Sequence, residues 1–398
     1  MLSNIKRVRC PAYILAGCAR PVQDMLIGEL RQALARRLAG YLIGAPERAT
    51  ARLEEGLELL LDLSQEPELA RAKIEACRSL VDEDARLGFI YRLPISAGFG
   101  VAIGRTIELA LFNDTRALTR AVTALLNVFM TLLDGLLDEA PEIIAPHFPG
   151  LVVLVRSGCQ GVDVAGAPAP EDHPFGDLCF CVAKLWLRKL ADLDDSRSAG
   201  SGGSQRTAYR AQRTSTVPTA KARPPARSPR SAFAAAAHHA LADEYASYLA
   251  CFAGGVPRTA TALHGRSRWP HWCQALACVV PHGWPPGAKA ADLRRFIFAV
   301  ADYASFLDDV CDYLSDCQAS RWNTVSYALY RRKRVPVCEA SAMQTALLLR
   351  LADDETADLV VESGLRLLGR IEHSAAALRL APSCVLPLIA DLTYGYLG

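Results

Sequence analysis

A long succession of Leu- and Ala-rich segments, with apolar residues at helical spacing, limits the fold of this chain most. Of its 398 residues, 51% are hydrophobic and only 7% are aromatic. Leu and Ala favour helices, whereas sheets are enriched in β-branched and aromatic residues. The periodicity predicts helices over 23–44, 47–63, 67–86, 116–139, 232–253, 289–317, 322–333 and 340–378. The sequence therefore predicts an all-α protein with a sizeable core.

Proline, glycine and tryptophan are expected to mark the places where the helices break. Helix ends are predicted at Pro46, Pro67 and Pro141. The glycines Gly98, Gly100 and Gly104 predict a bend that leads into a helix. A Trp/Pro-rich passage, from RWPHWCQ to PHGWPPG, is expected to separate the helices at 232–253 and 289–317.

Residues 194–230 differ sharply from the rest of the chain. They are rich in Ser, Gly, Pro and Arg and contain no acidic residue after Asp195. Such a composition cannot bury enough apolar surface to offset the entropy of ordering. We expect a disordered basic insertion at 194–230, between an N-terminal half (1–193) and a C-terminal half (231–398) of one helical domain. A solvated linker is the plainer interpretation, and contact with anionic lipid or nucleic acid is the alternative.

Charge, hydropathy and cysteine content limit the partners and the cellular location that we expect for the protein. A net charge of +2 creates no general attraction to nucleic acid, so no nucleic-acid partner is expected. No apolar run of 18 residues escapes a charge, and the N-terminal apolar run is too interrupted for a signal peptide, so no transmembrane segment is expected. The 13 cysteines are irregularly spaced and predict reduced, buried side chains in a cytoplasmic protein.

The segment TLLDGLLDEAPE ends a long apolar helix with acidic residues. Asp134 and Asp138 stand one turn apart, Glu139 follows, and Pro141 stops the helix. Carboxylates are unfavourable there because the C-terminus is already the negative end of the helix dipole. A solvated helix end is one interpretation, but the leucines around the two aspartates give them an apolar setting. A site for a cation is the other interpretation.

The segment FLDDVCDYLSDCQASRWNTVS carries a second acidic pattern. Asp308, Asp312 and Asp316 fall at i, i+4 and i+8 on a helix, and Asp309 stands beside the first. Like charges so spaced repel one another, and exposed helix faces usually intersperse Lys or Arg among them. An exposed acidic stripe is the plainer alternative. Because Mg²⁺ takes oxygen ligands, typically a few carboxylates and substrate phosphates, the pattern favours a magnesium site.

Basic residues follow this acidic ladder. They are Arg321, Arg331, Arg332, Lys333 and Arg334. Guanidinium groups bind phosphate through paired, charge-assisted hydrogen bonds. A solvated basic surface is the alternative for each of them. The combination predicts a diphosphate that is held by metal ions and by basic side chains.

The pair of patterns, DxxxD(E) and DDxxDxxxD…RWN, resembles the two metal-binding motifs of class I terpene synthases, in the isoprenoid synthase superfamily. The first is similar to the DxxxD variant of the large bacterial terpene synthases related to prenyltransferases. The interval between the motifs, with the insertion left out, is similar to the family's usual one. The chain departs from the family pattern at Asp312 and Asp316, where Ser or Thr and Glu are usual, and in lacking an Arg-Tyr pair near its end.

The resemblance implies an isoprenoid-synthase-type helical bundle that binds a cluster of up to three Mg²⁺ ions, with Mn²⁺ as a substitute. It implies that the enzyme ionises a linear prenyl diphosphate, cyclises the carbocation to a terpene and releases diphosphate. Carried over by motif, the metal ligands are Asp134, Asp138, Glu139, Asp308, Asp309, Asp312 and Asp316. Among them Asp134, Asp138, Asp308 and Asp312 are the expected catalytic residues, and Arg321 and Lys333 the expected diphosphate contacts.

Two other functions stay open at the level of sequence. One is a prenyltransferase of the same fold, either a polyprenyl diphosphate synthase or a squalene/phytoene-type condensing enzyme, since the DxxxD form also occurs in condensing enzymes. The other is a helical interaction protein with a disordered basic arm. The sequence is compatible with a homodimer as well as with a monomer. Neither the prenyl chain length of the substrate nor the product skeleton follows from the motifs.

Overall fold

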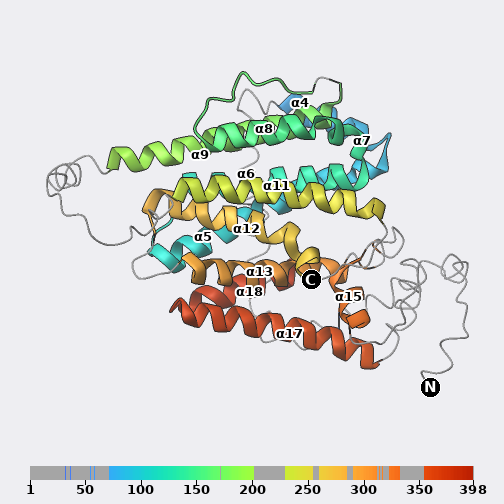
Figure 1. Cartoon of the computed structure of the whole chain (residues 1–398), viewed down its shortest axis with the longest axis vertical. Helices are drawn as coiled ribbons and strands as arrows, with labels where there is room; N and C mark the ends of the chain where they lie inside the picture. Colours follow the sequence, from blue (N-terminus) through green and yellow to red (C-terminus); the bar gives the residue numbers. More distant parts are fainter. Residues whose placement is uncertain are drawn as a thin grey trace, which may run out of the picture. The chain divides into compact units, whose positions relative to one another are not determined.

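The computed structural model describes residues 71–170, 172–200, 229–253, 260–284, 290–311, 322–331 and 354–397, with Gln32, Arg36, Glu54, Glu58, Tyr313 and Asp316 as single residues. Within these residues every regular element is a helix (Figure 1). The prediction of an all-α protein is confirmed for this part of the chain. The helices predicted at 23–44 and 47–63 lie outside the described residues, apart from the four single residues they contain.

The chain divides into two compact units. The α6 unit comprises Arg52–Leu241 and Trp272–Ala288, and the α13 unit comprises Met1–Ala51, Ala242–His271 and Lys289–Gly398. The division falls inside helices α11 (Pro229–Ala253) and α12 (Ala260–His282). It therefore does not follow the predicted halves, 1–193 and 231–398.

In the α6 unit, one long apolar helix is surrounded by the others. The elements wholly within this unit are α4 (Arg71–Val81), η4 (Ala85–Arg92), α5 (Leu93–Phe112), α6 (Ala117–Glu139), α7 (Pro141–Ile144), η5 (Ala145–His147), α8 (Phe148–Cys159) and α9 (Pro174–Gly200). Helix α6 packs most extensively on α5 and α9, and α9 also packs on α8 (Figure 1). Because thirteen of its 23 side chains are buried, α6 forms the centre of the unit's core.

In the α13 unit, helix α13 has the same central place. The elements wholly within it are α13 (Ala290–Cys311), α15 (Thr324–Arg331), α17 (Asp354–Ala377) and α18 (Pro382–Leu397). Helix α13 packs along α17 and also contacts α18 and α15 (Figure 1). Aromatic and aliphatic side chains of α13, including Phe296, Tyr303 and Phe306, are buried against these neighbours. The helix that carries Asp308 and Asp309 near its C-terminus is thus anchored by its apolar face.

The predicted bend at Gly98, Gly100 and Gly104 is wrong, because all three lie inside α5. A Cβ atom on Gly100 would lie 2.5 Å from the Thr123 carbonyl oxygen and 2.6 Å from the Ala124 Cα. The absence of a side chain allows the backbones of α5 and α6 to approach closely. Gly100, and Gly104 beside the Thr123 side chain, therefore serve helix packing and not a turn.

We expect Gly100→Ala to destabilise the α6 unit by about 1–3 kcal/mol, because the added methyl group meets main-chain atoms that cannot rotate away. Gly369→Ala is the control, since Gly369 also lies inside a helix but a Cβ there meets nothing within 4 Å. Alanine at that position should stabilise the protein by up to about 1 kcal/mol. Urea unfolding measures both changes, and similar values for the two variants would contradict the close approach of α5 and α6.

The first part of the Trp/Pro-rich passage, up to His282, is helical, contrary to the prediction, and the chain leaves the helix at Gly283, which has a positive φ of 80°. Helix α12 runs through it from Ala260 to His282, and Pro270 lies within the helix. The residues that follow this proline are strongly buried, with Trp272 at 6% exposure and Cys273 at 0%. Burial of these side chains outweighs the local cost of the proline, which tertiary packing commonly does.

The boundaries of the predicted insertion at 194–230 shift on both sides. Helix α9 continues to Gly200, and α11 begins at Pro229. The first and last residues of the predicted insertion are therefore helical. The remaining part, 201–228, lies outside the described residues, and its disorder stays a prediction.

The described cysteines agree with the prediction of reduced, buried side chains. None of those whose side chains are described forms a disulfide: Cys77, Cys159, Cys179, Cys181, Cys273 and Cys278 are buried, and Cys311 and Cys384 are half-buried. Burial raises the pKa of Cys77 and of Cys159 to about 12 each. At neutral pH these thiols are protonated, so they pack as small apolar groups.

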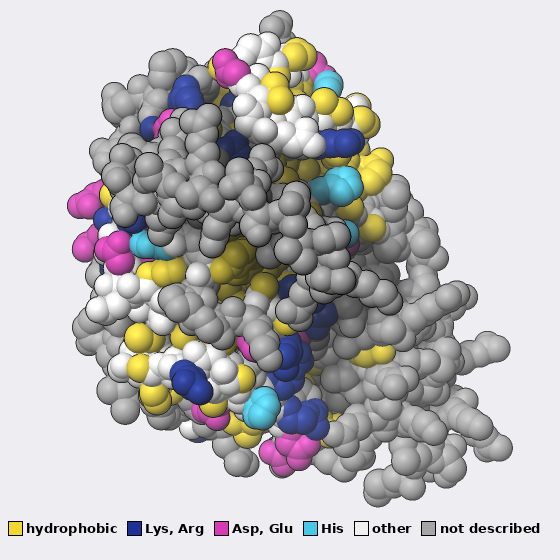
Figure 2. Space-filling model, turned by 60° about the vertical axis from the view of Figure 1, so that its left-hand side comes forward, with side chains coloured by type: hydrophobic (Ala, Val, Ile, Leu, Met, Phe, Trp, Pro, Cys, Tyr) yellow, Lys and Arg dark blue, Asp and Glu magenta, His cyan; other side chains and the backbone are white. Residues whose placement is uncertain are grey.

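Two stretches, Ala85–Phe112 and Ala117–Glu139, are long and apolar enough to cross a membrane by length and composition. More than half of each stretch is buried within the protein, 56% and 67%, as is usual for core helices. Large apolar side chains at the surface, such as Tyr91 and Val153, belong to different helices. Figure 2 shows hydrophobic side chains at the surface in several places, among polar side chains of both charges. The absence of a transmembrane segment and a cytoplasmic location stay predictions.

Candidate functional site

Helix α6 carries a narrow polar stripe that ends at the first acidic motif. The stripe consists of Asn127, Thr131, Asp134 and Asp138, all half-buried. At 3.6 residues per turn, these positions fall within roughly 60° around the helix axis. The leucines on both sides of the aspartates, Leu132, Leu133, Leu136 and Leu137, are at most 3% exposed. The two carboxylates therefore share one face of an otherwise apolar helix.

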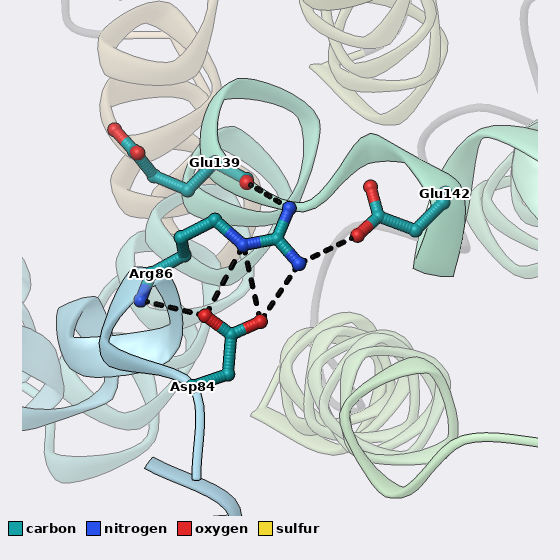
Figure 3. Close-up of polar contacts among 4 residues, drawn as sticks. All are labelled: Asp84, Arg86, Glu139 and Glu142. Carbon is teal, nitrogen blue, oxygen red and sulfur yellow. Dashed lines mark hydrogen bonds and ion pairs between the residues drawn. The ribbon is translucent and has the colours of Figure 1, made fainter. Parts of the chain in front are cut away.

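Arg86 stabilises the end of α6 just beyond these carboxylates (Figure 3). Its guanidinium donates to the main-chain carbonyl of Glu139 over 3.3 Å, and it binds the carboxylates of Asp84 (2.7 Å) and Glu142 (2.9 Å). Hydrogen bonds from Arg86 hold the pKa of Asp84 below its ordinary value. A cation at the helix C-terminus compensates the negative end of the dipole. This contact joins η4, α6 and α7 at the end that carries the motif.

Glu139 lies on a different side of α6 from the two aspartates. Successive residues are about 100° apart on a helix, so Glu139 points well away from the face of Asp138. Its side chain is exposed, and in Figure 3 the carboxylate is directed away from Arg86. The helix geometry thus favours Asp134 and Asp138 as a pair over any grouping with Glu139.

In the α13 unit, the second acidic motif meets the N-terminus of α15. Asn323 precedes α15, and its Oδ1 accepts from the Ser326 N–H (2.9 Å) while the Ser326 hydroxyl accepts from the Asn323 N–H (3.0 Å). This reciprocal pair is a capping box. The Asn323 amide also donates to the Asp309 carbonyl (3.2 Å) and to the Asp316 carboxylate (3.1 Å). The cap therefore ties α15 to the acidic ladder.

Asp309 faces inward and Asp308 faces outward. The Asp309 carboxylate accepts from the Thr324 N–H, at the first turn of α15, over 2.5 Å. Burial, followed by repulsion from Asp316, raises the pKa of Asp309 well above its ordinary value. Asp308 is exposed. Asp309 is thus engaged with the α15 terminus, whereas Asp308 lies on the exposed side of the helix.

A buried ion pair lies two turns before the ladder on α13. The Asp302 side chain is fully buried and accepts from Arg268 Nε (2.5 Å) and Nη2 (2.8 Å), and from Arg370 Nη2 (3.0 Å). The Arg268 side chain is 16% exposed, and its guanidinium lies 5.7 Å from the Phe298 ring centre. Together these contacts join α12, α13 and α17 within the unit. They hold in place the helix that carries Asp308 and Asp309.

Three predicted site residues, Asp312, Arg321 and Lys333, lie outside the described residues. Among the described ones, no group of three Asp, Glu, His or Cys side chains could hold a metal ion. The Asp134–Asp138 pair does fit half of a magnesium site, because carboxylate oxygens are the ligands Mg²⁺ prefers and both are half-buried on one face. The predicted ligand set as a whole stays a prediction.

The sequence reasoning missed several residues that shape these two motifs. Asn323 was read only as part of the RWN pattern, although Asn followed three residues later by Ser is a recognisable cap signal. Asn127 and Thr131 precede Asp134 at helical spacing in a helix that is otherwise apolar. That spacing could have revealed the stripe. Nothing local could have paired Asp302 with Arg268 and Arg370, which lie on other helices.

The fold and the two motifs define an all-α protein with an acidic pair on α6 and with Asp308 and Asp309 of the second motif on α13. No protein-family model and no curated protein matches the chain. Among solved structures, one match is the crystal structure of a linalool/nerolidol synthase from Streptomyces clavuligerus, with 14% sequence identity and a TM-score of 0.41. The match covers 83% of this chain and 95% of that one. At this TM-score the match carries no argument about activity.

Proposed function

We propose that the protein is a class I terpene synthase, which ionises a linear prenyl diphosphate and cyclises the resulting carbocation. The observation that carries this proposal is the α6 stripe, where Asp134 and Asp138 share a half-buried face among buried leucines. Two carboxylates at the negative end of a helix favour the binding of a cation there. The acidic ladder, as the second motif, supplies the remaining oxygen ligands in this proposal.

Mg²⁺ would be held by Asp134 and Asp138 from the first motif and by Asp308, Asp312 and Asp316 from the second. Bound Mg²⁺ neutralises charge on a leaving diphosphate. Asp309 contributes less in this scheme, because its carboxylate is already bound to the Thr324 N–H. Arg321 and Lys333 are proposed to bind the diphosphate oxygens directly.

The chain's own side chains would orient the substrate and keep water away from it. Leu133 and Leu137 flank the aspartates and are 0% and 3% exposed. An apolar wall beside the carboxylates suits the hydrocarbon part of a prenyl diphosphate, while the charged end meets the acidic motif. Exclusion of water also strengthens electrostatic interactions at the reacting centre and limits premature quenching of a carbocation.

The test is incubation of the full-length protein with one allylic prenyl diphosphate at a time, of increasing chain length, with Mg²⁺. We expect release of diphosphate and formation of a terpene hydrocarbon or alcohol from a single substrate molecule. A parallel reaction contains isopentenyl diphosphate as a second substrate. Chelation of Mg²⁺ should stop the reaction.

Two results would contradict the proposal in different ways. A product that forms only when two prenyl units are joined would identify a prenyltransferase of the same fold. No diphosphate release from any allylic substrate, with or without the second substrate, would favour a helical interaction protein.

A further inference from the structure

A buried glutamine on α12 is joined to the polar stripe of α6. The Gln274 side chain is fully buried, and its amide nitrogen donates to Asn127 Oδ1 over 2.5 Å. The Asn127 amide nitrogen in turn donates to the Ser96 main-chain carbonyl (2.9 Å). The Ser96 hydroxyl lies 2.6 Å from the Thr131 hydroxyl. All four residues belong to the α6 unit, so the network forms within one compact body.

The direction of the hydrogen bonds in this network is fixed by the Ser96 carbonyl. A carbonyl oxygen only accepts, so the Asn127 group that faces it must be the NH₂. The Asn127 oxygen then faces Gln274, which must present its own NH₂ group. The Gln274 carbonyl oxygen, Oε1, is therefore the group left over.

This oxygen has no hydrogen-bond donor among the described residues, although it is buried. In folded proteins the large majority of buried polar side-chain atoms have a partner, in the protein or in ordered water. An orphaned acceptor in an apolar core is unfavourable. The geometry thus calls for a small donor next to Gln274 Oε1.

The half-buried members of the network, Asn127 and Thr131, belong to the stripe. Asn127 and Thr131 are half-buried, whereas the α6 residues between them are buried. Asn127 precedes Asp134 by seven residues, which is about 10 Å along the helix axis. A group bound here would lie on the same face as the acidic pair but at some distance from it. For a prenyl diphosphate bound at Asp134 and Asp138, that is the side of the hydrocarbon chain.

We propose that Gln274 and Asn127, with the Thr131 hydroxyl, hold a water molecule that ends the reaction by adding to the carbocation. This inference rests on the proposed function and names its product class, a terpene alcohol. Water donates a hydrogen bond to Gln274 Oε1, which leaves an oxygen lone pair free. That lone pair forms the new C–O bond to the cationic carbon. One O–H bond of the resulting oxonium then breaks, its electrons stay on oxygen, and the proton passes to the released diphosphate.

Turnover in H₂¹⁸O tests the proposal on the unaltered protein. The reaction uses the allylic diphosphate that gives the fastest diphosphate release, and mass spectrometry follows the products. We expect an alcohol that carries ¹⁸O on carbon as the main product. Hydrocarbon as the main product, or alcohol without ¹⁸O, would overturn the inference while diphosphate release still supports the proposed function. Absence of diphosphate release would overturn both.

Two variants assign the water to this network. Gln274→Leu removes the acceptor, and Thr131→Val removes a hydroxyl while keeping the side-chain shape. Each should lower the ratio of alcohol to hydrocarbon by at least about fivefold. Thr119→Val is the matched control, because Thr119 is also a buried polar residue of α6 but lies outside the stripe. An unchanged product ratio in both test variants would overturn the assignment, and Thr131→Val serves if Gln274→Leu does not fold.

Discussion

Replacement of Asp134 and Asp138 together by asparagine is expected to lower the rate of Mg²⁺-dependent diphosphate release by at least about 100-fold. Changes in the groups that merely support metal ligands commonly cost 10- to 100-fold, and these two residues are proposed as ligands themselves. Asparagine keeps the side-chain shape but removes the negative charge that attracts Mg²⁺. The rate is measured as pyrophosphate released from an allylic diphosphate.

The control for this variant is Asp82→Asn/Glu83→Gln, which also removes two negative charges from the α6 unit. Asp82 and Glu83 are exposed, follow α4 and do not belong to the stripe. The control should keep the wild-type rate. Equal rates for wild type, control and Asp134→Asn/Asp138→Asn, with all three folded by circular dichroism, would remove the first motif from the proposed site.

Asp302→Asn is expected to cost about 3 kcal/mol of unfolding free energy. Asp302 is fully buried and compensates Arg268, which is only 16% exposed. Removal of one partner leaves an uncompensated charge inside the protein, which typically costs 3–5 kcal/mol. We take the lower end because Arg370, the other partner, is 54% exposed and can turn toward solvent. Urea unfolding measures the change in midpoint and slope.

Asp292→Asn on the same helix is the matched control for Asp302→Asn. Asp292 pairs with Arg295 over 2.5 Å, but the arginine side chain is 72% exposed. Exposed pairs contribute little, so this variant should lose less than about 1 kcal/mol. A loss at Asp302 as small as that at Asp292 would mean that the buried pair does not hold α13 in place.

Helical periodicity predicted the long helices well where the pattern was undisturbed. The segment 116–139 corresponds to α6, and 289–317 contains α13. The predicted helix end before Pro141 is confirmed, but the prediction of a break is wrong at Pro270 and at Gly98, Gly100 and Gly104. In α12 burial overrides Pro270, and in α5 the glycines permit contact with α6 instead of a turn. Local propensity is a weak guide at such positions, because packing against other helices decides the outcome.

The acidic residues of the candidate site could be found from spacing alone, but their individual environments could not. Asp308 and Asp309 are neighbours in sequence, yet one is exposed and the other is bound to the Thr324 N–H. Spacing does not show that difference, because it depends on how the segment after the ladder folds back. The hydrogen bond between Gln274 and Asn127 could not be predicted for the same reason, because the two residues are 147 positions apart in the sequence.

The central claim is that both acidic motifs bind one diphosphate through Mg²⁺, and a thermal-shift titration tests it most directly. A ligand at 100 times its dissociation constant stabilises a folded protein by about 2.7 kcal/mol. Wild type and the Asp82→Asn/Glu83→Gln control should both be stabilised when Mg²⁺ and pyrophosphate are added together, and by neither alone. Asp134→Asn/Asp138→Asn and Asp308→Asn/Asp312→Asn should each lose that stabilisation. An undiminished shift in either motif variant, or no shift in wild type, would contradict the claim.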